Sequence, residues 1–327
     1  MTQQTSKELL DDSIYERFDR RETVFSRIIG DEDAPFYEQG AYERAEQVLA
    51  EGDEAEAFEL ARAVGGWSVY DYFSGAFDPE PPRTEKNVMN KPVLTPPTDD
   101  PEVLAREVKR AAISYGAAEA GITEVDWKWI YEKSRSGEPV GLDSDYNHAI
   151  VVLVPVDPAP TSKSPGFPAA RESAVSYSRM AFIVSCMAEF IRRLGFRAWP
   201  AGNDTGISIP LAMDAGLGRL GRNGLLVNPD LGACLKICKI FTDMELAEDQ
   251  PLDPPLLENC RTCKLCSEAC KVDAISKNTE PTYETRCPAN NSGILRWPVD
   301  GYKCYQFWVE NGSDCSTCIA ACPLTRG

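Results

Sequence analysis

The sequence is short of histidine, of positive charge and of long apolar runs. Its 327 residues include a single histidine, His148, and 34 Lys and Arg against 51 Asp and Glu, which gives a formal net charge of −17. A lone histidine at the edge of a strand is more often structural than a metal ligand. A surface this acidic repels phosphate backbones and anionic lipid headgroups, so nucleic acid is not an expected partner.

Neither a membrane segment nor an export signal is recognisable in the sequence. The longest apolar runs, residues 149–156 and 180–187, are far shorter than the ~20 residues of a spanning helix. The pair Arg20-Arg21 is followed by Glu22 and by no apolar region, which argues against a twin-arginine signal. We therefore expect a cytoplasmic location, where twelve cysteines indicate metal or redox chemistry in place of disulfides.

Eight of the cysteines fall into two runs near the end of the sequence. The first run has the spacing CxxCxxCxxxC, and in the second a remote cysteine precedes CxxCxxxCP by ten residues. In bacterial ferredoxins three closely spaced thiolates hold one 4Fe-4S cluster, while the fourth cysteine of the run crosses to the other cluster. This arrangement predicts one cluster on Cys260, Cys263, Cys266 and Cys322, and a second on Cys270, Cys304, Cys315 and Cys318.

Zinc and disulfides are the competing interpretations of these cysteines. Structural zinc prefers two separated CxxC pairs, and nothing in the sequence indicates an oxidising compartment, so two clusters are favoured. The second run requires a ten-residue insertion to loop out and return before Cys304 can act as a ligand. The four remaining cysteines are expected to be ordinary buried thiols: Cys186, Cys234, Cys238 and Cys287.

Composition divides the chain into three expected domains. Residues 1–100 are charged, with a helical pattern over 41–64 and a proline-rich segment from residue 77 onward that reads as extended. Residues 101–248 alternate helical and strand patterns and form the expected core. Another proline-rich patch, at 249–255, separates the core from the cysteine-bearing part, so we predict the last domain over 249–327.

The periodicity of the core predicts an α+β fold. Its first helix has the N-cap residue Asp100 with Pro101 in the first turn, a favoured arrangement at a helix start. The β-branched run that begins at His148 is typical of a central strand buried on both faces, and Tyr177 lies on the buried stripe of the longest helix. The predicted helices span 100–116 and 171–194, and the predicted strands span 117–125, 148–156 and 196–201.

A glycine-rich stretch at 216–221 matches GxGxxG. A dinucleotide site needs a strand before that motif, whereas residues 210–215 look helical. We therefore expect these glycines to let the backbone pass close to some other large cofactor.

Two further strands, over 224–228 and 235–241, are predicted to form a hairpin through the turn at 229–232. On the second of them Lys236 shares a face with Cys238 and Ile240. A lysine that points inward from such a face is costly without a partner.

Several segments, in this order, resemble the corrinoid-dependent reductive dehalogenase family. Each motif is weak alone, and the series together with the paired cysteine runs is specific. The segments are RFDRRETVFSR at 17–27, YNHAIV at 146–151, SYSRM at 176–180, GND at 202–204, AGLGRLGRNG at 215–224 and KIFTD at 239–243.

The resemblance implies a core of nitroreductase-like fold that holds cobalamin in its base-off form, followed by a ferredoxin-like domain with two 4Fe-4S clusters. It implies that Tyr177 is the catalytic tyrosine, that Lys236 is the basic residue beside it and that Asn203 is an active-site asparagine. The chain lacks a DxHxxG motif, so it has no histidine of that kind to ligate cobalt. The residues expected to border the corrinoid are Gly216, Gly218, Gly221, Arg222, Asn223 and Gly224.

The implied reaction replaces a carbon-bound halogen of a small organohalide by hydrogen. A tyrosine hydroxyl, with an ordinary pKa of about 10, is a poor proton donor alone, and a lysine within ~4–6 Å stabilises the phenolate that remains. From the residues alone, a core tyrosine and a solvated Lys236 are the simpler interpretation.

Because no fused reductase module is seen, we expect a separate ferredoxin or flavodoxin to supply the electrons.

Two alternatives stay open. An epoxyqueuosine-reductase-like enzyme also combines cobalamin with iron–sulfur clusters, but its tRNA substrate is a polyanion, which the net charge of −17 disfavours. A non-catalytic electron-transfer ferredoxin is the second alternative. Corrinoid absorption bands beside those of the clusters would distinguish an enzyme from a carrier.

Overall fold

The computed structural model describes residues 5–40, 96, 98–252 and 256–325. The predicted helix over 41–64 and most of the proline-rich segment after residue 77 lie outside these ranges. In the part of the chain that is described, the main sheet has four antiparallel strands in the order β1-β2-β6-β3. Its strands are β1 (Glu119–Glu124), β2 (His148–Pro155), β3 (Ala198–Ala201) and β6 (Leu235–Thr242).

The alternation of β2 divides the interior into two apolar layers. Ile150 and Val152 point into one layer, and Val151 and Leu153 point into the other, because successive side chains of a strand face opposite sides of the sheet. All four side chains are fully buried. The prediction of a central strand at this position is therefore confirmed.

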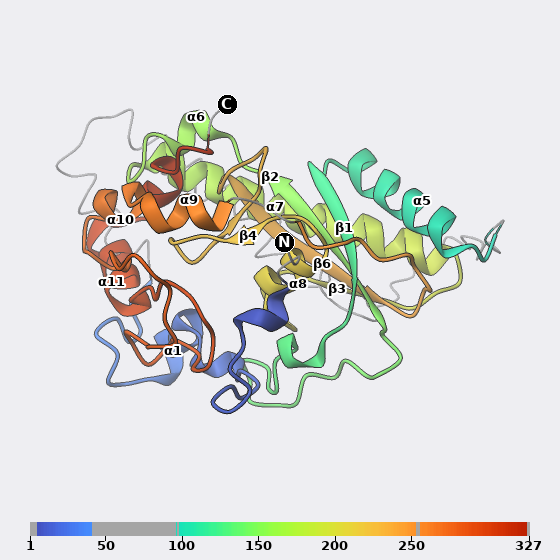
Figure 1. Ribbon diagram of the computed structural model, residues 1–327, viewed down its shortest axis with the longest axis horizontal. Helices are drawn as coiled ribbons and strands as arrows, with labels where there is room; N and C mark the ends of the chain where they lie inside the picture. Colours follow the sequence, from blue (N-terminus) through green and yellow to red (C-terminus); the bar gives the residue numbers. More distant parts are fainter. Residues whose placement is uncertain (1–4, 41–95, 97, 253–255, 326–327) are drawn as a thin grey trace.

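Two helices, α5 (Pro101–Ser114) and α7 (Phe167–Arg193), cover one face of the sheet (Figure 1). The Asp100 carboxylate accepts a hydrogen bond from the Glu102 amide at 2.9 Å and caps α5, as predicted. α7 begins four residues earlier than the sequence pattern indicated. Its second residue is Pro168, which suits a first helical turn because proline lacks the amide hydrogen that such a position leaves unused.

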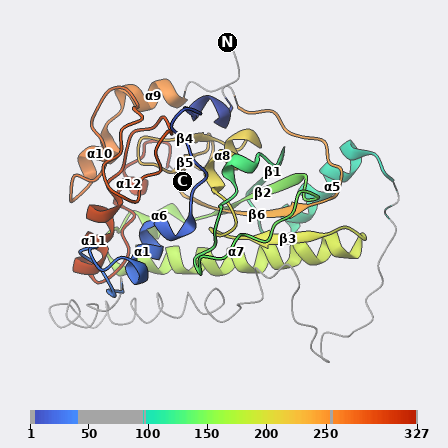
Figure 2. The ribbon, with the colours of Figure 1, turned by 90° about the horizontal axis from the view of Figure 1, so that it is seen from below.

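α7 is long and apolar enough to cross a membrane by length and composition. Half of its most apolar window is nevertheless buried inside the protein, and Figure 2 shows the helix lying along the sheet. Its side chains Met180, Val184 and Met187 belong to the apolar layer between α7, α5 and the strands. α7 is therefore a core helix of this fold.

The opposite face of the sheet is covered by α8 (Ser208–Asp214) and by two short 3-10 helices. Trp129 is fully buried there and donates its indole hydrogen to Ser6 Oγ at 2.8 Å. Ser6 also donates its amide hydrogen to the Asp214 carboxylate at 2.7 Å. These bonds fix the N-terminal segment to the core. The 3-10 helices are η1 (Ser6–Leu9) and η5 (Trp127–Trp129).

The predicted hairpin between strands 224–228 and 235–241 is wrong. β5 (Leu226–Val227) pairs with β4 (Arg219–Leu220) in a small separate sheet, whereas β6 pairs with β2 and β3. The predicted turn at 229–232 is present, since Asn228 Oδ1 accepts hydrogen bonds from the Asp230 and Leu231 amides, both at 2.9 Å. The turn reverses the chain, but β5 has only two residues. β6 therefore forms more backbone hydrogen bonds with its longer neighbours β2 and β3 than it could form with β5.

The cysteine-bearing part lies at one end of the sheet (Figure 1). The N-terminal helix α1 (Val24–Gly30) packs beside α11 (Gly301–Asn311), and nearby the Phe36 ring contacts the rings of Tyr302 and Tyr305 at centroid distances of 5.1 and 4.9 Å. α6 (Pro158–Thr161) contacts α12 from the core side. The helices of this part are α9 (Leu256–Thr262), α10 (Leu265–Ala269), α11 (Gly301–Asn311) and α12 (Thr317–Ala320).

Candidate functional site

Tyr177, Lys236 and Asn203 meet although they come from three different elements. The Lys236 ammonium lies 4.6 Å from the centre of the Tyr177 ring and donates a hydrogen bond to Ser173 Oγ at 3.3 Å. The Asn203 amide donates to the Tyr177 hydroxyl oxygen at 3.0 Å. Tyr177 therefore has a cation over its ring, a favourable arrangement, and a hydrogen-bond donor at its hydroxyl oxygen.

Local structure explains this convergence. Ser173 and Tyr177 are four residues apart on α7 and therefore share one helix face. Lys236 projects from β6 toward that face. Asn203 stands just after β3, which pairs with β6, so the sheet brings the loop after β3 to the same place.

Lys239, three residues after Lys236, was not predicted as a site residue. It points to the other side of β6, is fully buried, and donates to the Gly202 carbonyl at 2.6 Å and to Ser208 Oγ at 3.0 Å. Burial lowers the pKa of Lys239 to about 8. The lysine thus holds both ends of the loop that presents Asn203. The sequence did contain a signal for Lys239, because Lys236 and Lys239 fall on opposite faces of an otherwise apolar strand.

A cavity of about 450 Å³ extends from Tyr177, Lys236 and Asn203 to the cysteine-bearing part. Four cysteines line it, and they are the ones that the spacing assigned to the second cluster: Cys270, Cys304, Cys315 and Cys318. Val24 and Phe25 of α1 close one side of the cavity. Its volume falls in the range of ordinary ligand sites.

A second cavity, of about 260 Å³, is lined by the other predicted set of four, Cys260, Cys263, Cys266 and Cys322. Within the described ranges, no three His, Cys, Asp or Glu side chains gather closely enough to hold a single metal ion. A zinc site needs four ligands at about 2.0–2.3 Å from one ion, whereas a cluster spreads its thiolates over four iron atoms. Each cavity thus brings together four cysteines, the number of thiolates that holds one 4Fe-4S cluster.

The cysteines of each set perturb one another. Burial, together with the neighbouring Cys315 and Cys270, raises the pKa of Cys304 to about 12. Burial and the nearby Cys260 raise the pKa of Cys266 to about 11. Thiols in such surroundings become thiolates only when positive charge is placed among them, as the irons of a cluster would do.

The remaining cysteines follow the prediction only in part. Cys234 and Cys238 are buried, and burial raises the pKa of Cys238 to about 12. Cys186 and Cys287 are partly exposed, so the prediction of four buried thiols is wrong for these two. Cys186 lies on α7 but is not among the residues of that helix that are buried.

Most of the glycine-rich stretch faces protein. A Cβ atom on Gly216 would lie 2.5 Å from the Gln250 carbonyl oxygen, and one on Gly218 or Gly221 would lie 2.6 Å from Val227. Close approach of β5 and of the 249–252 segment therefore explains these three glycines. Only Asn223 and Gly224 of the six residues expected to border a corrinoid line the larger cavity.

Arg222 differs most from its expected role. Its side chain is 1% exposed and stacks on the Trp297 ring with the guanidinium carbon 4.7 Å from the ring centre. It donates to the backbone carbonyls of Cys260 at 2.6 Å, Cys263 at 3.0 Å and Ser276 at 2.9 Å. Arg222 therefore stabilises the backbone of the first cysteine run, because its guanidinium points at the carbonyls of that segment.

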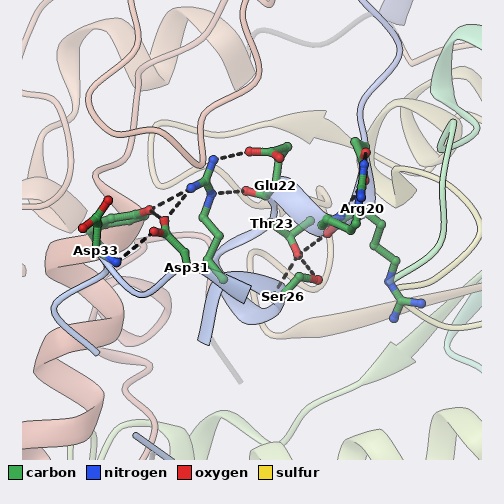
Figure 3. A network of polar contacts seen from close by, with 10 residues as sticks. Arg20, Glu22, Thr23, Ser26, Asp31 and Asp33 are labelled. Atoms are coloured by element: carbon green, nitrogen blue, oxygen red, sulfur yellow. Dashed lines mark hydrogen bonds and ion pairs between the residues drawn. The ribbon is translucent and has the colours of Figure 1, made fainter. Parts of the chain in front are cut away.

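The N-terminal motif at 17–27 supports the wall of the larger cavity. Arg27 donates to the Glu22 carboxylate and, at 2.5 Å, to Asp31, and Figure 3 shows Glu22 and Asp31 on two sides of its guanidinium. The Tyr302 hydroxyl of α11 donates to the same Asp31 carboxylate at 2.7 Å. This network joins α1, and with it Val24 and Phe25, to the helix that carries Cys304.

Comparisons with known proteins agree with this arrangement. No family model matches the chain. A tetrachloroethene reductive dehalogenase of Desulfitobacterium hafniense is 43% identical over 180 residues, which are 54% of this chain and 33% of the relative. Another, of Sulfurospirillum multivorans, is 32% identical over 262 residues, which are 71% of this chain and 52% of the relative. The chain belongs to the reductive dehalogenase family.

The chain spans about a third to a half of the length of these relatives. Two structures of the catabolic reductive dehalogenase NpRdhA match 98% of this chain and 43% of their own, with TM-scores of 0.75 and 0.73 at 24% and 22% identity. The second contains 3-bromo-4-hydroxybenzoic acid. An epoxyqueuosine reductase of Staphylococcus aureus is 30% identical over 129 residues, which are 38% of this chain. The mixed α and β fold is thus that of a reductive dehalogenase.

Proposed function

We propose that the chain carries out reductive dehalogenation, in which an organohalide, two electrons and one proton give the dehalogenated product and a halide ion. The observation that carries this proposal is a single cavity lined at one end by Tyr177, Lys236 and Asn203 and at the other by four cysteines. A group that fills such a cavity touches both a proton donor and a source of electrons.

Cobalamin, when bound between these two ends, would supply a reduced cobalt centre that takes the halogen from carbon. A corrinoid is larger than the 450 Å³ cavity, so the fit concerns the part of the group that lies between the two ends. Asn223 and Gly224 would border it there. The proposal includes a nitroreductase-like core, in which the cobalamin is base-off, and a ferredoxin-like domain.

The residues of the chain supply the proton. The Tyr177 hydroxyl gives its hydrogen to the carbon that loses the halide, and the phenolate is left beside the Lys236 ammonium and the Asn203 amide. A cation over an aromatic ring contributes about 0.5–2 kcal/mol, and an amide bond to a charged oxygen about 1.5–3 kcal/mol. Both contributions are greater after the proton has left than before.

The two sets of four cysteines would each hold one cluster. The cluster on Cys270, Cys304, Cys315 and Cys318 would lie nearer to Tyr177, because these cysteines line the same cavity. A 4Fe-4S cluster carries one electron at a time, so two clusters in sequence suit a two-electron reduction supplied by a separate ferredoxin or flavodoxin. A simple electron carrier has no use for the cavity or for the three side chains at its far end. The epoxyqueuosine reductase match covers less of the chain than the dehalogenase matches.

Halide release by anaerobically reconstituted protein tests the proposal. Tetrachloroethene and 3-bromo-4-hydroxybenzoic acid are suitable probes. The first appears in the name of a similar dehalogenase, and the second is bound in a similar structure. We expect wild-type protein with clusters and cobalamin to release halide, and the Tyr177→Phe variant to lose at least about 100-fold in rate, because the proton donor is gone.

The control for this experiment is the amount of iron and corrinoid that the variant binds. Tyr177→Phe should retain wild-type iron and the same corrinoid absorption, because the phenyl ring still packs against Lys236. Unchanged turnover in Tyr177→Phe would remove the tyrosine from the mechanism. Absence of halide release from fully loaded wild-type protein on every organohalide offered would contradict the proposed function.

A further inference from the structure

Two hydroxyl side chains lie beside the sulfur of Cys315, one of the cysteines predicted to hold a cluster. Thr317 Oγ1 lies 3.2 Å from Cys315 Sγ, and the Thr317 amide nitrogen lies 3.5 Å from the same sulfur. Ser164 Oγ is 3.1 Å from Thr317 Oγ1 and 3.8 Å from Cys315 Sγ. Ser164 belongs to the loop between α6 and α7, so the core contributes to the surroundings of this cysteine.

The hydrogen-bond directions follow from what each atom can do. The Ser164 oxygen accepts a hydrogen bond from the Ser316 amide at 2.8 Å, so its own hydrogen is left to donate. A thiolate has no hydrogen and only accepts. Once Cys315 is a thiolate, the Thr317 hydroxyl at 3.2 Å is the nearer of the two hydroxyls that can donate to the sulfur. The Ser164 hydroxyl can donate to Thr317 Oγ1 at 3.1 Å or, over a longer distance of 3.8 Å, to the sulfur itself.

The loop that carries Ser164 is fixed to the cysteine-bearing part by further bonds. The Asn311 side-chain amide donates to the Pro165 carbonyl at 2.9 Å, and the Ser313 hydroxyl donates to the same oxygen at 3.4 Å. The hydroxyl chain from Ser164 to Cys315 is therefore held from both ends, and hydrogen bonds in such a chain strengthen one another.

We propose that Thr317, supported by Ser164, raises the reduction potential of the cluster held by Cys270, Cys304, Cys315 and Cys318. When that cluster accepts one electron from an external donor, negative charge on the Cys315 sulfur increases, and the hydroxyl stabilises the reduced form more than the oxidised form. Hydrogen bonds to the sulfurs are among the factors that set cluster potentials. The inference rests on the ligand role of Cys315 in the proposed function.

The first cysteine run provides a natural comparison. Thr262 stands immediately before Cys263, as Thr317 stands immediately before Cys318, but the Thr262 hydroxyl donates to the Asn259 carbonyl at 3.3 Å. The Cys260 carbonyl accepts from Arg222 in this run. A threonine beside a cysteine is thus present in both runs, and in the second it lies against a sulfur.

A redox titration followed by electron paramagnetic resonance tests the inference on anaerobically reconstituted chain, with dithionite as the reductant. In Thr317→Val we expect the ratio of reduced to oxidised cluster at a fixed potential to fall about two- to tenfold for one cluster, as expected for the loss of one hydrogen bond. The other cluster should titrate as in wild type. Thr317→Ser keeps the hydroxyl and should restore the wild-type titration, and Thr262→Val should change neither cluster.

Ser164→Ala removes only the outer member of the chain, so a smaller shift in the same direction is expected. Identical titrations of wild type and Thr317→Val, or an equal shift of both clusters, would overturn the proposal. If Thr317→Val fails to load one cluster, Ser164→Ala decides, and an unshifted titration there overturns the proposal. Failure of the proposed function has another signature, since halide release can be absent from protein whose two clusters titrate as described.

Discussion

Lys239 combines complete burial with a functional position. Its ammonium has two oxygen partners, the Gly202 carbonyl before Asn203 and the hydroxyl of Ser208, the first residue of α8, so it contacts both ends of the loop that carries Asn203. Burial lowers its pKa, and the nearby Asp204 carboxylate offsets only part of that effect. A lysine suits this position because its long side chain carries several donors and reaches both oxygens.

The lowered pKa of Lys239 predicts a dependence of stability on pH. Below pH about 8 the lysine is protonated in the folded and unfolded states, and between about 8 and 10.5 only the unfolded state keeps the proton. The unfolded state then binds more protons, so the free energy of unfolding contributed by Lys239 rises with pH in this window. From pH 7.5 to 9.5 the expected rise is about 2 kcal/mol.

Urea unfolding of wild type and Lys239→Met at the two pH values measures this effect. The variant has no group to titrate at this position, so the stability of wild type relative to Lys239→Met should increase with pH, whichever protein is more stable at pH 7.5. A difference that stays constant, or that shrinks as pH rises, would contradict the assignment of a pKa near 8.

At the residue scale the sequence predicted the partners of Tyr177 and missed the support beneath them. Tyr177, Lys236 and Asn203 were assigned by resemblance to the family, and Tyr177 and Asn203 lie in the segments 176–180 and 202–204 that carry it. Lys239 and Ser173 were missed, because a buried lysine and a helical serine look like ordinary surface residues until the sheet places them. Arg222 was misassigned for the same reason, since the direction of its side chain depends on residues about 40 positions away.

Among the elements, β1 and the end of α8 are packed with no space between them. Gly121 of β1 lies opposite Val151 of β2, and a Cβ atom at Gly121 would overlap the Ala215 carbonyl oxygen. That atom is backbone and cannot move alone. The close packing also fixes the start of the glycine-rich stretch, because Gly216 follows Ala215 directly.

Gly121→Ala should therefore destabilise the protein by about 2–4 kcal/mol, because the added methyl group forces β1 and α8 apart. Thermal or urea unfolding measures the loss. The matched control is Gly30→Ala at the end of α1, where no atom lies within 4 Å of the added Cβ, and little change is expected. Equal stability of Gly121→Ala and wild type would show that β1 and α8 can separate freely.

The sequence predicted elements where the pattern was local. α5, β1, β2, α7, β3 and α8 were all expected near their observed positions, because capping residues and apolar periodicity act over a few residues. The partner of a strand is a non-local property. The hairpin of β5 with β6 was expected from a good turn, but a turn does not reveal that β6 will lie between β2 and β3.

At the scale of the whole molecule, one arginine connects the core to the first cysteine run. Arg222 follows β4 in the small sheet of the core, and its guanidinium donates to carbonyls of the 260–263 segment and, at 2.9 and 2.6 Å, to those of Ser276 and Asn278. The flat face of the guanidinium stacks on Trp297. The spacing of the cysteines predicted the two sets of four, but no sequence pattern indicated which core residue would hold the first set in place.

The planar guanidinium is essential to this role, because a lysine has no fork of donors to satisfy several carbonyls in one plane. In Arg222→Lys the carbonyls of Cys260 and Cys263 lose partners, and the first cysteine run is held less firmly. We expect reconstituted Arg222→Lys to bind about half the iron of wild type, with the cluster of Cys270, Cys304, Cys315 and Cys318 retained. Iron and sulfide analysis with electron paramagnetic resonance measures both quantities.

Arg219→Lys is the matched control, because Arg219 is also buried, belongs to the same hairpin, and donates to the Leu252 carbonyl at 2.5 Å, which lies outside the cysteine runs. Its iron content should equal that of wild type. If Arg222→Lys keeps full iron, the carbonyl contacts are dispensable for loading the first set. If Arg219→Lys loses as much iron as Arg222→Lys, the small sheet as a whole, and not the contacts of Arg222, holds the cysteine run.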